Sequence, residues 1–158
     1  MALEVPQQVL DYLKGEKTVT LATASSDGVP HASTFMYVNN GPELYFWARP
    51  TSTTAKHIQA NPRVSFAIDE YVEDWNKAKG IQGDGQCQLV SSGDDIAQAV
   101  GLFAEKFPTP SSGASTTNIS FFKITPASLQ FIDNSGATIN VSEDEFGMDF
   151  HRQQVLSE

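Results

Sequence analysis

The segment ELYFWARPTSTTAKHIQANPRVSF, residues 43–66, carries residue types that suit the binding of an anion. An aromatic strand ends here, the chain turns at Pro50, and a hydroxyl-rich helix start follows. The free backbone N–H groups of a helix's first turn, together with the positive end of its dipole, attract a phosphate or carboxylate. Hydroxyl donors and positive charge would come from nearby side chains: Thr51, Ser52, Thr54, Arg49 and Lys56. Ordinary N-capping by one hydroxyl explains the same pattern and remains open.

Other catalytic and metal-binding patterns are missing from the sequence. It holds no G-x-S-x-G turn, HExxH motif, EF-hand loop, Walker loop or GxGxxG motif. His31, His57 and His151 are too few to indicate a proton relay, and we interpret each as a surface or partly packed residue. The acidic group at 143–145 is typical of a solvated face. We therefore predict no metal site and assign no catalytic side chain.

Composition limits the classes of partner. The chain has 158 residues, which is typical of one domain, and carries 10 Lys and Arg against 19 Asp and Glu, a formal net charge of −9. This acidity argues against broad contact with nucleic acid, which needs a dense Lys and Arg surface. No apolar run approaches the roughly 20 residues of a membrane span, and the start has no secretory signal. With the single Cys87 excluding an intrachain disulfide, we expect a cytoplasmic protein without membrane or nucleic-acid partners.

The elements that must position these groups form a mainly β pattern with short helices. Helices are predicted where apolar residues recur at helical spacing: 3–14, 51–60, and from Asp94 or Asp95 to Phe107. Strands are predicted where β-forming residues lie between turn signals: 18–24, 31–38, 43–48, 63–68, 80–90, 119–126 and 128–133. The first three strands indicate an antiparallel meander, because their connections are too short for parallel crossovers.

Three details of this pattern are specific enough to be tested. The glycines of 80–90 permit a bulge or a close backbone approach. The last helix should bury one apolar stripe, formed by Ile96, Val100, Phe103 and Phe107. Residues 1–140 should form a single domain, followed by an acidic, loosely held tail at 141–158.

The order of these segments resembles the FMN-binding split-barrel proteins related to pyridoxamine 5′-phosphate oxidase. The similarity covers roughly residues 5–133. It rests on short motifs spread along that range: Asp27-Gly28-x-Pro30, Phe46-Trp47, Asn61-Pro62-Arg63-Val64-Ser65, Gly83 and Phe107-Pro108. The resemblance implies a six-stranded antiparallel split β-barrel and a homodimer with flavin at the subunit interface. The ending FGMDFHRQQVLSE lacks the Arg- and His-bearing stretch of authentic pyridoxamine phosphate oxidases, so we predict no role in vitamin B6 synthesis.

The same resemblance implies which residues contact FMN. The strand segment from Ala32 to Tyr37, which includes Phe35, would run beside the isoalloxazine ring, with the backbone and hydroxyls of Ser33 and Thr34 contacting its polar edge. Trp47 and Ala48 would lie near the ribityl chain or phosphate. The phosphate itself would be surrounded by Thr51, Ser52, Thr53 and Thr54, with Lys56 one helical step further on.

One departure from the family bears on this phosphate site. The family commonly has Arg-Lys after the serine, whereas this chain has Thr53-Thr54. A hydroxyl donates a hydrogen bond but does not neutralise a phosphate dianion. Lys56 or Arg49 would have to compensate, and otherwise FMN affinity should be weak.

Three functions follow as alternatives. The first is an FMN-binding flavoprotein, an oxidase or reductase of a small molecule, in which the flavin performs the redox chemistry. The second is a non-enzymatic split-barrel dimer that has lost flavin or binds another ligand, haem or a deazaflavin, and Thr53-Thr54 favours it. The third is a nucleic-acid-binding barrel, which aromatic residues favour and the net charge opposes.

Overall fold

The structure is a computed structural model that describes residues 4–108, 118–135, 142–143, 149–150 and 152–156. Its helices are α1 (Gln7–Gly15), α2 (Thr53–Ala60) and α3 (Gly93–Lys106), with one 3₁₀ turn, η1 (Trp75–Lys77). The strands before α3 are β1 (Thr18–Ala24), β2 (Pro30–Met36), β3 (Val38–Asn40), β4 (Glu43–Ala48), β5 (Arg63–Asp69) and β6 (Lys79–Leu89). Those after it are β7 (Ser120–Asp133), β8 (Ser142–Glu143), β9 (Asp149–Phe150) and β10 (Arg152–Leu156).

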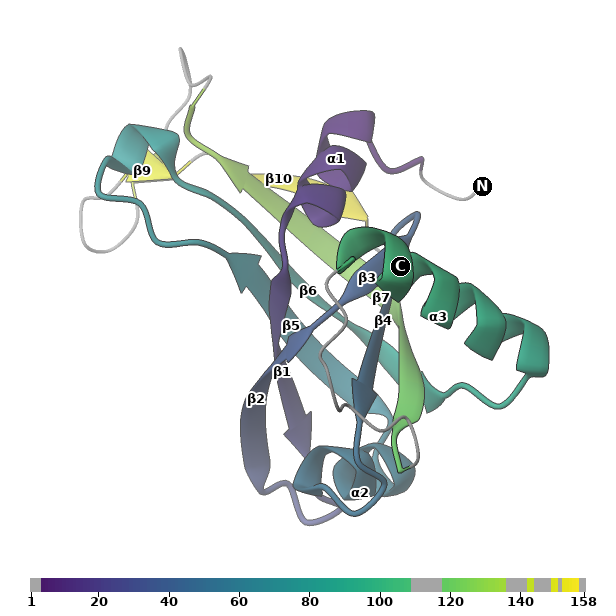
Figure 1. Cartoon of the computed structure of the whole chain (residues 1–158). Coiled ribbons are helices and arrows are strands. Elements are labelled where there is room, and N and C mark those ends of the chain that lie inside the picture. Colours follow the sequence, from purple (N-terminus) through teal and green to yellow (C-terminus); the bar gives the residue numbers. More distant parts are fainter. Residues whose placement is uncertain (1–3, 109–117, 136–141, 144–148, 151, 157–158) are drawn as a thin grey trace.

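The strands form one curled antiparallel sheet. Its order is β2-β1-β5-β6-β7-β4-β3, with β10 added to β7, and β8 pairs separately with β9. The two ends of this path, β2 and β3, are consecutive in the chain with only Tyr37 between them. The sheet therefore curls round on itself into a barrel-like shape. The helices α1 and α2 lie at opposite ends of this barrel (Figure 1). This architecture confirms the predicted split-barrel class, although the main sheet has eight strands where the resemblance implied six.

Alternation along the strands builds the core. In β1 every second residue from Val19 is buried, and β5 repeats the pattern with Val64, Phe66 and Ile68. Since side chains of a strand point to opposite faces in turn, both strands present one apolar face to the barrel interior. Val9 and Leu13 of α1 and Ala55 and Ile58 of α2 join that interior cluster. A second cluster lies under α3 and includes Val38, Tyr45, Val90 and Ala99.

Strand pairing refines two predictions. The predicted strand 31–38 divides at Tyr37, so that β2 pairs with β1 while β3 pairs with β4. The predicted strands 119–126 and 128–133 are one continuous strand, β7. The register shifts between Asp84 and Gly85: Asp84 pairs with Ser128 and Gly85 with Pro126, so Ala127 is the extra residue. A Cβ at position 85 would lie 2.9 Å from the Pro126 Cα. The bulge and close approach expected from the glycines are thus confirmed.

The last helix corrects two further predictions. The Ser92 hydroxyl, rather than Asp94 or Asp95, caps α3 by accepting from the Asp95 N–H. The stripe expected to be buried is only partly so, because Ile96 and Val100 are 37% and 49% exposed while Ala99 is fully buried. Ala99, rather than Ile96 or Val100, therefore faces the sheet.

The C-terminal region adds pairing that the sequence did not indicate. β10 lies in the segment expected to be a loosely held tail, and it pairs with β7 from Arg152↔Ile132 to Leu156↔Leu129. Asp144, Glu145 and His151 lie outside the described residues. Within the part of the chain that is described, no helix is long and apolar enough to cross a membrane.

Candidate functional site

The N-terminus of α2 lies where β4 ends, as the sequence predicted. Ser52 is its N-cap residue: the Ala55 N–H donates to Ser52 Oγ at 3.1 Å and the Lys56 N–H to the Ser52 carbonyl at 3.1 Å. The helix ends at Asn61-Pro62, where the Asn61 N–H donates to the His57 carbonyl. The Ser52 hydroxyl therefore performs the ordinary capping role that the sequence left open.

Capping by Ser52 leaves other donors of this turn unused. The backbone N–H groups of Thr53 and Thr54 have no acceptor among the described residues. The Thr54 side chain is only 3% exposed, and its hydroxyl also has no hydrogen-bond partner there. Buried polar groups are nearly always paired, and an unpaired one costs about 1–3 kcal/mol. An orphaned hydroxyl beside two free N–H groups is what a bound anion would satisfy.

The other side chains predicted around the phosphate differ in exposure. Thr51, Thr53 and Lys56 are exposed, as is Arg49 just before the turn. Ala48 is buried, whereas Trp47, its neighbour on β4, is 36% exposed. The two cations are thus free to approach a ligand but are not held against the helix N-terminus by any ion pair among the described residues.

The predicted residues of β2 are divided between two faces. Phe35 points inward, where its ring centroid lies 4.8 Å from that of Phe46. Ser33 is on the same face and lies 2.9 Å from the Nε2 atom of His31. Thr34 is exposed on the opposite face, where its hydroxyl lies 3.4 Å from that of Thr20. A ligand on one face of β2 would therefore contact the side chain of Ser33 or that of Thr34, but not both.

A polar chain that the sequence did not reveal joins α2 to the barrel. His57 Nδ1 lies 3.0 Å from the hydroxyl of Thr23, which is 4% exposed. The rings of His57 and His31 meet edge to face with centroids 5.8 Å apart, and His31 continues to Ser33. Register explains the grouping, since Thr23 pairs with His31 across β1 and β2. Only this pairing brings His31 and His57, 26 positions apart in the sequence, together.

The remaining chemistry-bearing groups in the described part of the chain support no covalent or metal site. Burial raises the pKa of the Cys87 thiol to about 12, so this side chain stays a protonated, inert thiol. Across the residues that the structure describes, no three His, Cys, Asp or Glu side chains gather in a way that would hold a metal ion.

Comparison with known proteins supports the fold. The family model described as pyridoxamine 5′-phosphate oxidase matches residues 5–133. The heme oxygenase HutZ of Vibrio cholerae is 23% identical, over 87% of this chain and 81% of its own length. A conserved hypothetical protein of Mycobacterium tuberculosis superposes with a TM-score of 0.72 at 17% identity, covering 90% of this chain and 96% of that one.

A FAD-binding protein of Mesorhizobium loti is a third relative. It superposes with a TM-score of 0.63 at 23% identity, over 78% of this chain and 90% of that one. Structural likeness at these identities shows a shared fold, while the family model extends over most of the sequence. The chain belongs to the pyridoxamine 5′-phosphate oxidase family.

Proposed function

We propose that this protein is an FMN-binding flavoprotein, an oxidase or reductase of a small molecule, with the FMN phosphate at the N-terminus of α2. The observation that carries the proposal is the buried Thr54 hydroxyl without a partner, beside the two unused N–H groups of Thr53 and Thr54. Together they supply three donors at the positive end of a helix, which suits a phosphate.

The surrounding residues fit the rest of the cofactor. The indole of Trp47, exposed at the end of β4, offers an aromatic surface next to the phosphate site. Ser33 offers a polar side chain near the isoalloxazine, since it lies on the face of β2 that reaches α2 through His31 and His57. FMN would supply the hydride or electron transfer, and the protein's part is to bind, orient and shield it.

The electrostatics predict modest FMN affinity. Thr53 and Thr54 replace the family's basic pair, and the nearest cations are the exposed Arg49 and Lys56. An exposed cation near a phosphate contributes little because water and salt screen it. On a chain of net charge −9, hydrogen bonding rather than charge neutralisation would hold the phosphate.

The outer face of β2 is suited to contact with a second copy of the chain. β2 leaves Met36 45% exposed, and Val29 in the preceding turn is 59% exposed. Between them lie small side chains of the outer face, among them Ala32 and Thr34. Such a surface of small residues flanked by exposed apolar ones suits close contact with another sheet, and we propose a homodimer on this face.

Haem binding is the second candidate, and the His31–His57 pair favours it. Imidazole is a common ligand of haem iron, and the α2 N-terminus would take a haem propionate as readily as a phosphate. The relatives in Vibrio cholerae and Mesorhizobium loti, one a heme oxygenase and one a FAD-binding protein, leave both cofactor classes within the family's range.

One titration separates the candidates. Purified protein is titrated with FMN, followed by flavin fluorescence, and in parallel with haemin, followed by the Soret band, while light scattering gives its mass. The proposal expects saturable FMN binding at up to tens of micromolar, one FMN per chain, and a dimer mass. Saturable haemin binding that His31→Ala or His57→Ala weakens, without FMN binding, would favour the second candidate. No binding of FMN would overturn the first.

A further inference from the structure

A cavity of about 370 Å³ opens at the end of the β5–β6 pair that is remote from α2. α2 leads into β5 at Arg63, whereas the cavity begins at Ala67, after which β5 ends. The volume lies within the usual range for small-molecule sites. The cavity is therefore separate from the proposed FMN phosphate site, and neither the family resemblance nor the FMN proposal assigns it a role.

Small side chains give the cavity its depth. Its floor is formed on one face of the sheet by Ala67, Gly80 and Ile132, with Ala78 beside them. A Cβ at position 80 would lie 3.3 Å from the Ile68 carbonyl oxygen, so a side chain there would both crowd the backbone and fill the floor. The absence of a side chain at Gly80 leaves the surface hollow where β5 and β6 pair.

The wall above this floor is held in place by hydrogen bonds. Asp74 caps η1 by accepting from the backbone and side-chain nitrogens of Asn76 at 3.0 and 3.1 Å. Asn134, which is 8% exposed, donates from its side chain to the Trp75 carbonyl and from its backbone to the Ala78 carbonyl. The loop between β5 and β6 is thus anchored to the chain following β7, and the cavity is preformed.

Two aromatic side chains line the opening. Tyr71 is 88% exposed and Trp75 is 60% exposed, and both belong to the lining of the cavity. Aromatic faces offer apolar contact, and they also attract cations through the negative charge of their π systems.

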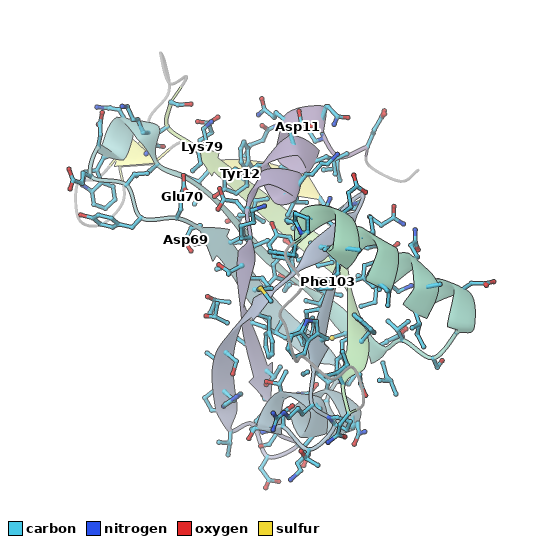
Figure 2. All side chains as sticks on the ribbon, in the orientation of Figure 1. Asp11, Tyr12, Asp69, Glu70, Lys79 and Phe103 are labelled. Carbon is cyan, nitrogen blue, oxygen red and sulfur yellow. The ribbon has the colours of Figure 1, made fainter. Side chains whose placement is uncertain are left out.

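The charges on the rim favour a cation. Asp69 and Glu70 line the cavity with a single basic side chain, Lys79, and Figure 2 shows all three at the end of the sheet near Tyr12. No cation lies within 4.0 Å of either carboxylate among the described residues. These carboxylates also act on a neighbouring acid: after burial, Glu70 contributes most to raising the pKa of Glu16, and Asp69 adds to it.

We propose that this cavity binds a small organic cation, an amine or quaternary ammonium carried on an aromatic or apolar body. The body would occupy the floor over Ala67 and Ile132, and the cation would lie between the aromatic side chains and the carboxylates of Asp69 and Glu70. This is a second ligand site, independent of the cofactor at α2.

The test compares two probes of matched size and opposite charge. Isothermal titration with 2-phenylethylamine and with 3-phenylpropionate measures both affinities for the 158-residue chain. The amine is expected to bind about tenfold or more tightly than the acid. The double variant Asp69→Asn/Glu70→Gln should lower amine affinity about tenfold, whereas Glu73→Gln, which removes an exposed carboxylate from the same loop but outside the lining, should change it less than about twofold.

Two further variants locate the binding. Ala67→Leu fills the floor and should abolish binding while thermal unfolding remains cooperative, and Thr54→Val at α2 should leave amine binding intact. Equal binding of amine and acid, an equal loss in Glu73→Gln, or no amine binding at 10 millimolar (order of magnitude for a weak fragment) would overturn the proposal.

Discussion

His57 Nδ1 on α2 and Thr23 Oγ1 on β1 lie 3.0 Å apart, and this contact ties the proposed anion-binding helix to the wall of the barrel. Thr23 is buried, and the ring of His31 packs edge to face against the ring of His57. The position of α2 thus depends on Thr23, a residue 34 positions before His57 in the chain.

Thr23→Val removes this tie without changing the shape of the side chain. The His57 nitrogen loses its partner, so we expect the free energy of unfolding to fall by about 1 kcal/mol, as measured by urea unfolding. Thr18→Val, on an exposed position of the same strand, is the control and should change it by less than about 0.5 kcal/mol. Equal effects of the two variants would show that the contact contributes nothing.

Thr53→Lys restores a cation to the phosphate site. Because Thr53 is exposed, the new ammonium stays solvated, whereas lysine at the buried position 54 would pay for desolvation. FMN affinity should rise about three- to tenfold at low salt, and the gain should shrink at 0.5 M salt (an order-of-magnitude choice; screening shortens the Debye length to a few Å). Gln59→Lys, exposed in the last turn of α2, should leave FMN affinity unchanged; an equal rise there would point to net charge alone.

Lys106, at the end of α3, predicts a pH dependence of stability. Its Nζ donates to the Leu13 carbonyl and lies 4.0 Å from the centroid of the Tyr37 ring. Burial, and then the neighbouring Lys17, lowers its pKa from 10.5 to about 8. The unfolded chain therefore binds more protons than the folded one between these values, so stability should rise with pH from about 8 toward 10.

The Lys106→Met variant isolates this effect. The amine is only half-buried, so solvent screening reduces the expected gain to the order of 1 kcal/mol. The unfolding free energies of wild type and variant are measured at pH 7.5 and 9.5, roughly either side of the folded-state pKa. Between these two pH values the wild type should gain about 1 kcal/mol of stability relative to the variant. A pH-independent difference would contradict the assignment.

Gly83 and Gly101 predict opposite outcomes for the same substitution. A Cβ at Gly83 would collide with the Phe66 ring and lie 2.9 Å from Leu129 Cδ2, so Gly83→Ala should destabilise by about 1–3 kcal/mol. A Cβ at Gly101 on α3 meets nothing within 4 Å, so Gly101→Ala should stabilise by about 0.5–1 kcal/mol. Thermal unfolding of both variants checks the prediction, and a stable Gly83→Ala would show that the core yields there.

Local signals explain what the sequence predicted. Alternating residues in 18–24 and 63–68, and the stop at Asn61-Pro62, reflect short-range geometry, and these elements were placed to within about one residue. The single strand β7 escaped prediction because Pro126 normally interrupts a strand, whereas here it pairs with Gly85 beside a bulge at Ala127. β10 also escaped, since its pairing with β7 depends on a distant partner.

The residues of the candidate site were likewise only partly predictable from local sequence signals. The helix start at Ser52 follows from residue types alone, whereas the burial of Thr54 depends on how α2 packs against β1 and the core. The division of Ser33 and Thr34 between two faces follows from strand alternation, but the contact of His31 with His57 required the register of β1 with β2. The cavity beside Gly80 depends on the anchoring of a loop by Asn134, which no local pattern indicates.

The most direct test of the central claim compares FMN with riboflavin, which lacks only the phosphate. Affinities are measured by flavin fluorescence for wild type, Thr54→Val and Thr54→Ser. The account predicts that wild type and Thr54→Ser bind FMN about tenfold or more tightly than riboflavin, and that Thr54→Val loses most of this preference while its unfolding free energy stays equal or rises. Equal affinity of the wild type for FMN and riboflavin would contradict an anion site at the N-terminus of α2.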